Sequence, residues 1–256
     1  LWVTFLGGTF DDYGYDFAID GIGNIYVTGR SEGAWGCSSP CTVVSYNDVD
    51  SYVAKLDSTG NLLWNTFSGG SGAETGNGIV VDGSGNTFVT GYSDLTWGSP
   101  KKAHGGGAND AFVALLDSNG GLTWNTFTGG SGANYGNDIA LDGNGDVYVI
   151  GQSDATWGAS PARGYGALTD GFVAKFTSLG ALTWNTFLGG SAADSGTSII
   201  DDGGGNLYVT GVSASAWGCP SPCTVRAYTS SGDDGFLAKL NATDGSLTWN
   251  TFQGGS

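Results

Sequence analysis

The sequence predicts an all-β fold built from four copies of one unit. Composition is the first indication: 48 of the 256 residues are glycine and only 12% are charged, which suits turn-rich β structure and leaves little material for surface helices. The aromatic content is the second, because 9 Trp, 11 Tyr and 12 Phe are enough to pack a core. An internal repeat of about sixty residues is the third and strongest.

One segment, L-T-W-N-T-F-x-G-G-S, recurs along the chain with little change. Its tryptophans stand at intervals of 62, 60, 60 and 65 residues, at Trp2, Trp64, Trp124, Trp184 and Trp249. A second series keeps the same phase and comprises Trp35, Trp97, Trp157 and Trp217. Because the two series include every tryptophan of the chain, we expect equivalent positions for them in each unit.

Each unit is predicted to contain four short strands. In the second unit these are expected at residues 77–81, 87–91, 112–116 and 122–127. The runs of Asp, Gly, Ser and Asn between them tolerate the positive φ of hairpin turns. Four antiparallel strands at fixed spacing are typical of propeller blades, whose open faces are buried by neighbouring blades. We therefore predict a β-propeller or propeller-like array of four four-stranded blades, with about 60 residues per repeat.

We expect one repeat domain over residues 1–256. Its blade repeats are predicted at approximately 2–63, 64–123, 124–183 and 184–248, with a fifth Trp strand at 249–256. The Trp strand thus has one copy more than the other strands, and three explanations stay open. The chain is an excerpt of a longer array, or a ring closes with a spare strand, or that strand pairs with a neighbouring molecule. A contact of the last kind that does not close builds a filament.

Several motifs resemble a known repeat family. G-N-x-Y-V-T-G occurs at Gly23–Gly29 and Gly205–Gly211, D-x-F-V-A-K-L at Asp170–Phe176 and Asp234–Leu240, and x-F-L-G-G-S follows. Together they resemble the SBBP-type β-propeller repeat of bacterial and archaeal surface proteins, over essentially the whole chain. The resemblance implies the propeller fold and an extracellular or cell-surface location, and it supplies no shared catalytic residues.

Charge and hydropathy exclude two classes of partner. The formal net charge is −16 and Lys plus Arg total only 8, so we expect no nucleic-acid partner. No apolar run reaches transmembrane length, so we expect no membrane insertion.

The four cysteines form two C-x3-C pairs, Cys37 with Cys41 and Cys219 with Cys223, just after the loop tryptophans of repeats one and four. A short loop closed by a local disulfide suits a secreted protein with an even cysteine count, and we predict two such disulfides. A zinc site with four thiolates is the alternative, because repeats one and four would be neighbours in a closed ring.

Catalytic residues are not indicated, and we predict that the chain is not an enzyme. The only histidine, His104, lies in a polar glycine-rich loop where we expect it to be exposed. Asp201 is the most unusual acid, because it replaces residues that are apolar in the other repeats, Ile19, Val81 and Leu141. If the first strand lines a central channel, Asp201 is a partly buried acid with a raised pKa. If the strand end faces water, Asp201 has no special role.

Two ligand hypotheses rest on few residues. Asp142, Asn144 and Asp146 match the start of a D-x-N-x-D calcium loop, but the following glycine and a distal acid are missing, so a hairpin turn explains them better. The loop tryptophans Trp35, Trp97, Trp157 and Trp217 are candidates for stacking on sugars, whereas packing between blades is the favoured interpretation. Solvent exposure of these rings decides between the two.

The sequence therefore predicts an extracellular structural or adhesive β-propeller scaffold that assembles head to tail into filaments by strand addition, with other copies of itself as partner. A multivalent carbohydrate-binding propeller, with glycans as partner, is the alternative, and a glycoside hydrolase is the least favoured. No cofactor is expected, with calcium the one candidate.

Overall fold

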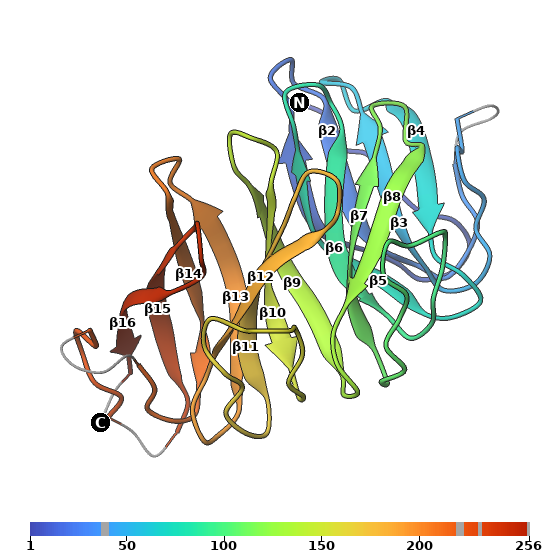
Figure 1. Ribbon diagram of the computed structural model, residues 1–256. Coiled ribbons are helices and arrows are strands. Elements are labelled where there is room, and N and C mark those ends of the chain that lie inside the picture. Colours follow the sequence, from blue (N-terminus) through green and yellow to red (C-terminus); the bar gives the residue numbers. More distant parts are fainter. Residues whose placement is uncertain (37–40, 219–222, 230–231, 255–256) are drawn as a thin grey trace. The chain divides into compact units, whose positions relative to one another are not determined.

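The computed structural model describes residues 1–36, 41–218, 223–229 and 232–254. Over these residues the secondary structure is entirely β, and no helix is long and apolar enough to cross a membrane. The strands form four antiparallel sheets of four strands each, and neighbours in sequence are neighbours in the sheet (Figure 1). The all-β prediction with four four-stranded blades is thereby confirmed.

The sheets are called blades 1 to 4 in chain order. Blade 1 consists of β1 (Asp12–Ile19), β2 (Ile25–Ser31), β3 (Asp50–Leu56) and β4 (Leu62–Ser68). Blade 2 consists of β5 (Glu74–Val81), β6 (Thr87–Ser93), β7 (Asp110–Leu116) and β8 (Leu122–Thr128). Blade 3 consists of β9 (Asn134–Leu141), β10 (Val147–Ser153), β11 (Asp170–Phe176) and β12 (Leu182–Leu188). Blade 4 consists of β13 (Asp194–Asp201), β14 (Asn206–Ser213), β15 (Asp234–Asn241) and β16 (Leu247–Gln253).

The chain divides into two compact units. Unit 1 comprises Leu1–His104 with Asn109–Thr128 and holds blades 1 and 2, whereas unit 2 comprises Gly105–Ala108 with Gly129–Ser256 and holds blades 3 and 4. Each sheet ends on a Trp strand, so the sequence repeats that were predicted to begin on that strand straddle two blades. The single repeat domain over the whole chain stays a prediction.

The first hairpin of each blade is fixed by one aspartate. In blade 2, Asp82 Oδ1 accepts hydrogen bonds from the backbone N–H groups of Ser84 at 2.8 Å and Asn86 at 2.9 Å. The Asn86 amide donates to Asp82 Oδ2 at 2.8 Å, and Gly85 supplies the positive φ of 80° that the turn requires. Asp20, Asp142 and Asp202 fix the equivalent turns through the same backbone bonds.

The loop tryptophan of each blade packs against aromatic side chains of its own sheet. In blade 2, Trp97 makes edge-to-face contacts with Phe112 on the third strand at 5.3 Å and with Phe127 on the fourth at 6.0 Å. Such aromatic pairs add about 1 kcal/mol each to the area they bury. The same triplet recurs in the other blades as Trp35–Tyr52–Phe67, Trp157–Phe172–Phe187 and Trp217–Phe236–Phe252. This contact explains why the second Trp series keeps the repeat phase.

Candidate functional site

A double-glycine turn carries the chain from each Trp strand into the next blade. After β4, the Gly70 N–H donates to Glu74 Oε2 at 2.9 Å, and after β12 the Gly190 N–H donates to Asp194 Oδ2 at 2.8 Å. The preceding glycine is needed for space: a Cβ on Gly69 would lie 2.1 Å from Asp50 Oδ1 and 2.2 Å from Glu74 Oε2. The G-G-S motif is therefore a backbone cradle for carboxyl groups at the junction of two blades.

The junction of blades 1 and 2 buries two carboxyl groups side by side. Asp50 begins β3, Glu74 begins β5, and they are 1% and 0% exposed. The two distances to the added Cβ place Asp50 Oδ1 and Glu74 Oε2 no more than 4.3 Å apart. Burial raises the pKa of Asp50 to about 6 and the pKa of Glu74 to about 7. Asp50 Oδ1 has no hydrogen-bond partner in the described part of the chain.

The junction of blades 3 and 4 repeats this arrangement and adds a positively charged side chain. A Cβ on Gly189 would lie 2.4 Å from Asp170 Oδ1 and 2.7 Å from Asp194 Oδ2. Arg163 lies beside the pair, because its Nη2 donates to the Gly189 carbonyl at 2.6 Å and its Nη1 to the Phe187 carbonyl at 3.0 Å. Burial raises the pKa of Asp170 to about 6, and the positive charge of Arg163 acts in the opposite direction.

These carboxyl pairs were not predicted from the sequence. Their members belong to different repeats, so neither lies in a local motif with the other. A signal was present, because the third strand begins with aspartate in every repeat, at Asp50, Asp110, Asp170 and Asp234. An acid at a fully buried strand start indicates a specific partner.

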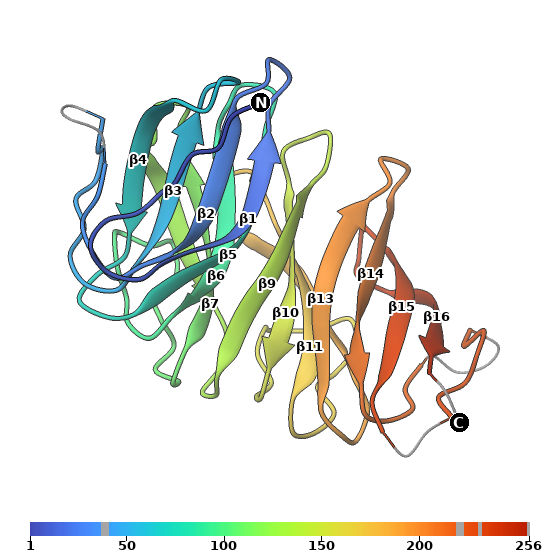
Figure 2. The ribbon, with the colours of Figure 1, turned by 180° about the vertical axis from the view of Figure 1, so that it is seen from behind.

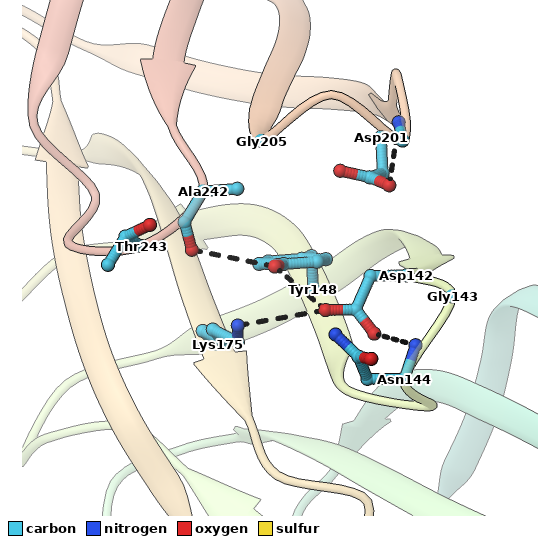
Figure 3. Close-up of a pocket in the computed structure, with 10 residues that line it drawn as sticks. Asp142, Gly143, Asn144, Tyr148, Lys175, Asp201, Gly205, Ala242 and Thr243 are labelled. Atoms are coloured by element: carbon cyan, nitrogen blue, oxygen red, sulfur yellow. Dashed lines mark hydrogen bonds and ion pairs between the residues drawn. The ribbon is translucent and has the colours of Figure 1, made fainter.

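Unit 2 contains a polar cavity of about 390 Å³ beside the first hairpin of blade 3 (Figure 3). Its lining includes Asp142, Tyr148 and Lys175 from blade 3 and Asp201 and Thr243 from blade 4. The cavity thus brings together the candidate calcium loop and the unusual acid of repeat four.

The ammonium group of Lys175 lies between the carboxylates of the candidate calcium loop. Its Nζ is 3.0 Å from Asp146 Oδ2 and 3.7 Å from Asp142 Oδ2. Burial opposes the charge of Lys175, but its contacts with Tyr148 and Asp146 outweigh burial and raise its pKa above the usual range. Lys175 therefore balances the negative charge of Asp142 and Asp146.

The geometry favours the hairpin-turn interpretation of Asp142, Asn144 and Asp146 over the calcium one. Asp142 Oδ1 is already engaged by the N–H groups of Asn144 at 2.8 Å and Asp146 at 2.9 Å. Within the described ranges no group of three or more His, Cys, Asp or Glu side chains is placed to hold a metal ion.

Asp201 is partly buried at the end of β13 and lines the cavity, as Figure 3 shows. Its Oδ2 accepts a hydrogen bond from the Gly203 N–H at 3.0 Å. The odd residue of repeat four thus belongs to the same cavity as Lys175, but its carboxylate caps its own turn.

The loop tryptophans differ in exposure. Trp97, Trp157 and Trp217 are only 4%, 5% and 6% exposed, and aromatic rings of their own blades cover them. These three therefore offer no open ring for stacking on a sugar, which corrects the carbohydrate hypothesis for them. Trp35 is partly buried and lines a cavity of about 300 Å³ together with Tyr46.

The expectation of an exposed His104 is wrong. Its side chain is 7% exposed, its ring packs against Phe127 at 5.9 Å, and its Nδ1 is 4.0 Å from Asp110 Oδ2. The other blades place a tyrosine against the same phenylalanine, at Tyr46, Tyr165 and Tyr228. In blade 2, His104 thus takes the place of the tyrosine. This equivalence could not be read from the sequence because the loops differ in length.

The cysteine pairing stays a prediction. Cys37 and Cys219 lie outside the described residues. Neither Cys41 nor Cys223 is a free thiol.

Comparison with known proteins supports the fold. Residues 1–34 match the family model described as the SBBP β-propeller repeat. An uncharacterised WD repeat-containing protein of Acanthamoeba polyphaga mimivirus is 24% identical over 223 residues, which cover 69% of this chain and 16% of that protein. The chain therefore spans much less than two thirds of this relative.

A crystal structure of a protein of unknown function from Bacteroides caccae has a TM-score of 0.46 and 11% identity, covering 94% of this chain and 81% of that one. The family match at residues 1–34 is consistent with the SBBP-type β-propeller repeat that the motifs indicated, and the four repeated four-stranded sheets agree with a propeller-like arrangement of blades.

Proposed function

We propose that this chain is an extracellular structural or adhesive scaffold that assembles head to tail into filaments by strand addition. The observation that carries the proposal is one blade-to-blade contact used repeatedly. Trp64 of blade 1 sits on Gly120 in the last hairpin of blade 2, and Trp184 of blade 3 sits on Gly245 in the last hairpin of blade 4. A contact that joins any blade to the next has no intrinsic end.

The chain leaves apolar surface available for continuing this contact. On β1, Tyr13, Tyr15, Phe17 and Ile19 are 43%, 50%, 63% and 57% exposed. Two residues at equivalent positions of β5, Ile79 and Val81, pack against blade 1. Exposed apolar side chains of this kind support β1 as an interaction site.

An extracellular or cell-surface location is part of the proposal. It is supported by the SBBP-type repeat and by the two C-x3-C pairs. No catalytic role is proposed, because the two acids that line the polar cavity make structural contacts: Asp142 lies near Lys175, and Asp201 accepts a hydrogen bond within its own turn. No cofactor is part of the proposal, and Lys175 lies beside Asp142 and Asp146, the acids considered for calcium.

Carbohydrate binding is a second candidate with a narrower basis. It rests on Trp35, whose cavity also contains Tyr46 and Phe67. A single site of this kind binds glycans monovalently, without the avidity that four equivalent tryptophans would give. A glycan array probed with the wild-type chain and with Trp35→Ala separates this role from the scaffold role.

The test of the scaffold is the mass of the full chain in solution as concentration and salt are varied. We expect concentration-dependent oligomers by size-exclusion chromatography with light scattering. Salt should strengthen association, because subunits of net charge −16 repel one another at low ionic strength. A chelator should leave the mass unchanged. A monomer at every concentration and salt would contradict the proposal.

A further inference from the structure

Blades 1 and 2 enclose a small cavity in unit 1. β5 of blade 2 lies against β1, β2 and β3 of blade 1, as Figure 2 shows for the blue strands. The cavity has a volume of about 120 Å³, and its lining includes Val44, Phe67 and Gly69 from blade 1 and Trp97 from blade 2. Leu122 also lines it, and because Val44 and Leu122 are 41% and 38% exposed, the lining reaches the molecular surface.

At the corresponding junction of unit 2, the side chain of Arg163 makes three contacts. Its Nη1 donates to the Phe187 carbonyl at 3.0 Å and its Nη2 to the Gly189 carbonyl at 2.6 Å. Its Cζ lies 5.5 Å from the centre of the Trp217 ring, which is within the range of a cation–π contact. The guanidinium group thus contacts a fourth-strand phenylalanine, the first glycine of the double-glycine turn and the loop tryptophan of the next blade.

Each of these three contacts has a counterpart in the lining of the unit 1 cavity. The repeats share the segment L-T-W-N-T-F-x-G-G-S and the loop tryptophan, so the correspondence follows from the sequence. The cavity of unit 1 therefore presents the groups that hold the guanidinium in unit 2. The corresponding residues are Phe67 and Phe187, Gly69 and Gly189, and Trp97 and Trp217.

Val44 takes the place of Arg163 in blade 1 and differs in kind from its other counterparts. The residue at this place is identified by its backbone carbonyl, which accepts the N–H of the fourth-strand phenylalanine; it is Lys102 in blade 2 and Arg226 in blade 4. Arg226 repeats the contact to the turn, because its Nη2 donates to the Gly254 carbonyl at 2.9 Å. Valine has neither the charge nor the length of these side chains, so blade 1 keeps the surroundings of a guanidinium without supplying one.

The charge next to the cavity favours a cation. Gly69, which lines it, lies against the buried carboxyl groups of Asp50 and Glu74. In unit 2 the positive charge of Arg163 favours the charged form of the corresponding acid, Asp170. A cation in the unit 1 cavity would act on the Asp50–Glu74 pair in the same way, at a site where solvent screens charge weakly.

We propose that the unit 1 cavity binds a small guanidinium compound from solution. The ligand takes the contacts that Arg163 makes in unit 2: its N–H groups donate to the carbonyls of Phe67 and Gly69, and its face lies against Trp97. A planar group with several fixed N–H donors suits two carbonyls and an aromatic face better than an ammonium ion, which is a compact point charge. The site does not depend on the proposed assembly, because its residues all belong to unit 1 of one chain.

The test is an NMR titration of the full chain with methylguanidinium at millimolar concentration. We expect a saturable shift of the Trp97 indole N–H signal, which is assigned by its absence in Trp97→Phe. Methylurea has nearly the same shape but no charge, so it should bind at least tenfold more weakly. Equal binding of the two compounds, or no saturable shift with methylguanidinium, would overturn the site, and neither result depends on the folding of a cavity variant.

Substitutions at the mouth of the cavity locate the ligand. Val44→Arg supplies a guanidinium from the chain itself and should weaken methylguanidinium binding at least tenfold. Val43→Arg is the matched control, because Val43 is equally exposed at 42% and lies outside the cavity lining; it should leave the affinity within about twofold. Arg163→Ala should open a second site in unit 2, detected as a new shift of the Trp217 indole signal. Binding that survives Val44→Arg, or no second site in Arg163→Ala, would contradict the proposal.

Discussion

The junction of blades 1 and 2 and the junction of blades 3 and 4 share the double-glycine turn but differ in charge. In unit 1 the Asp50–Glu74 pair is acted on by further carboxylates, those of Asp48 and Asp94. In unit 2 the Asp170–Asp194 pair has Arg163 beside it. The backbone carbonyl of Arg163 accepts a hydrogen bond from the Phe187 N–H, and the Val44 carbonyl accepts the equivalent bond from the Phe67 N–H. Val44 is therefore the counterpart of Arg163 in unit 1.

The difference shows that geometry and charge are set separately at these junctions. The double glycine fixes where the carboxyl groups lie, and a loop residue decides whether they meet a cation. The pair without a cation binds a proton below about pH 7, because burial disfavours the charged form of both carboxyl groups and the charge of Asp50 adds to this effect on Glu74. The junction of blades 1 and 2 should therefore respond to pH more than the junction of blades 3 and 4.

The largest effect should come from a substitution in the double-glycine turn that both junctions share. Gly69→Ala places a methyl group 2.1 Å from Asp50 Oδ1 and 2.2 Å from Glu74 Oε2, both held in buried positions. We expect a loss of about 3 kcal/mol in the free energy of unfolding, measured in urea. Gly83→Ala is the matched control, since nothing lies within 4 Å of its added Cβ. Equal stability of the two variants would show that the cradle is not required.

The second effect is the pH dependence of unit 1. Burial raises the pKa of Glu74 from 4.5 to about 7, so the folded state binds the proton more tightly than the unfolded state. The stability that this proton contributes is complete below pH 4.5 and is lost as the pH rises through 7. Glu74→Gln should remove most of this loss and stabilise the protein at pH 8 by about 2 kcal/mol.

Unit 2 provides the contrast for that variant. Asp194→Asn should stabilise the protein at pH 8 by less than Glu74→Gln does, because burial also raises the pKa of Asp194 but the positive charge of Arg163 opposes that shift. An amide fits this place in the fold, since the Ser153 hydroxyl donates to Asn134 Oδ1 at 2.6 Å in blade 3. If Asp194→Asn stabilised the protein at pH 8 as much as Glu74→Gln does, the proposed charge difference would be wrong.

The third effect is smaller and comes from exchanging the loop residues Val44 and Arg163 between the two junctions. Val44→Arg should bring a guanidinium to the Asp50–Glu74 pair and stabilise by about 1 kcal/mol at pH 8, with no gain at pH 4. Arg163→Val should cost a similar amount at pH 8. Thermal unfolding at both pH values measures this, and a gain from Val44→Arg that persists at pH 4 would indicate packing rather than charge.

The smallest effect concerns the hydrogen bonds across each junction. Asp16 Oδ2 accepts the Ile79 N–H in unit 1, and Asp138 Oδ2 accepts the Ile199 N–H in unit 2, both at 2.9 Å. In unit 2 the Ser198 hydroxyl also donates to Asp138 at 2.7 Å, and the equivalent residue of unit 1 is Gly78. Ser198→Ala should therefore cost about 0.5–1 kcal/mol in urea. A cost above that of Gly69→Ala would reverse the proposed ranking.

The sequence predicted the blades because their signals are local. Asp-Gly-x-Gly-Asn fixes a hairpin through its own backbone, as Asp82 shows, and the Trp series marks equivalent strands. The junction pairs escaped because Asp50 and Glu74 come from two repeats and meet only when blades stack. His104 was misplaced for a related reason: its role is visible only beside the tyrosines that take its position in loops of other lengths.

The central claim is that one blade-to-blade contact, repeated within the chain, continues from copy to copy. Negative-stain electron microscopy of the full chain over a range of concentrations tests it most directly. We expect regular filaments whose repeating unit contains four blades. Isolated particles at every concentration would contradict it.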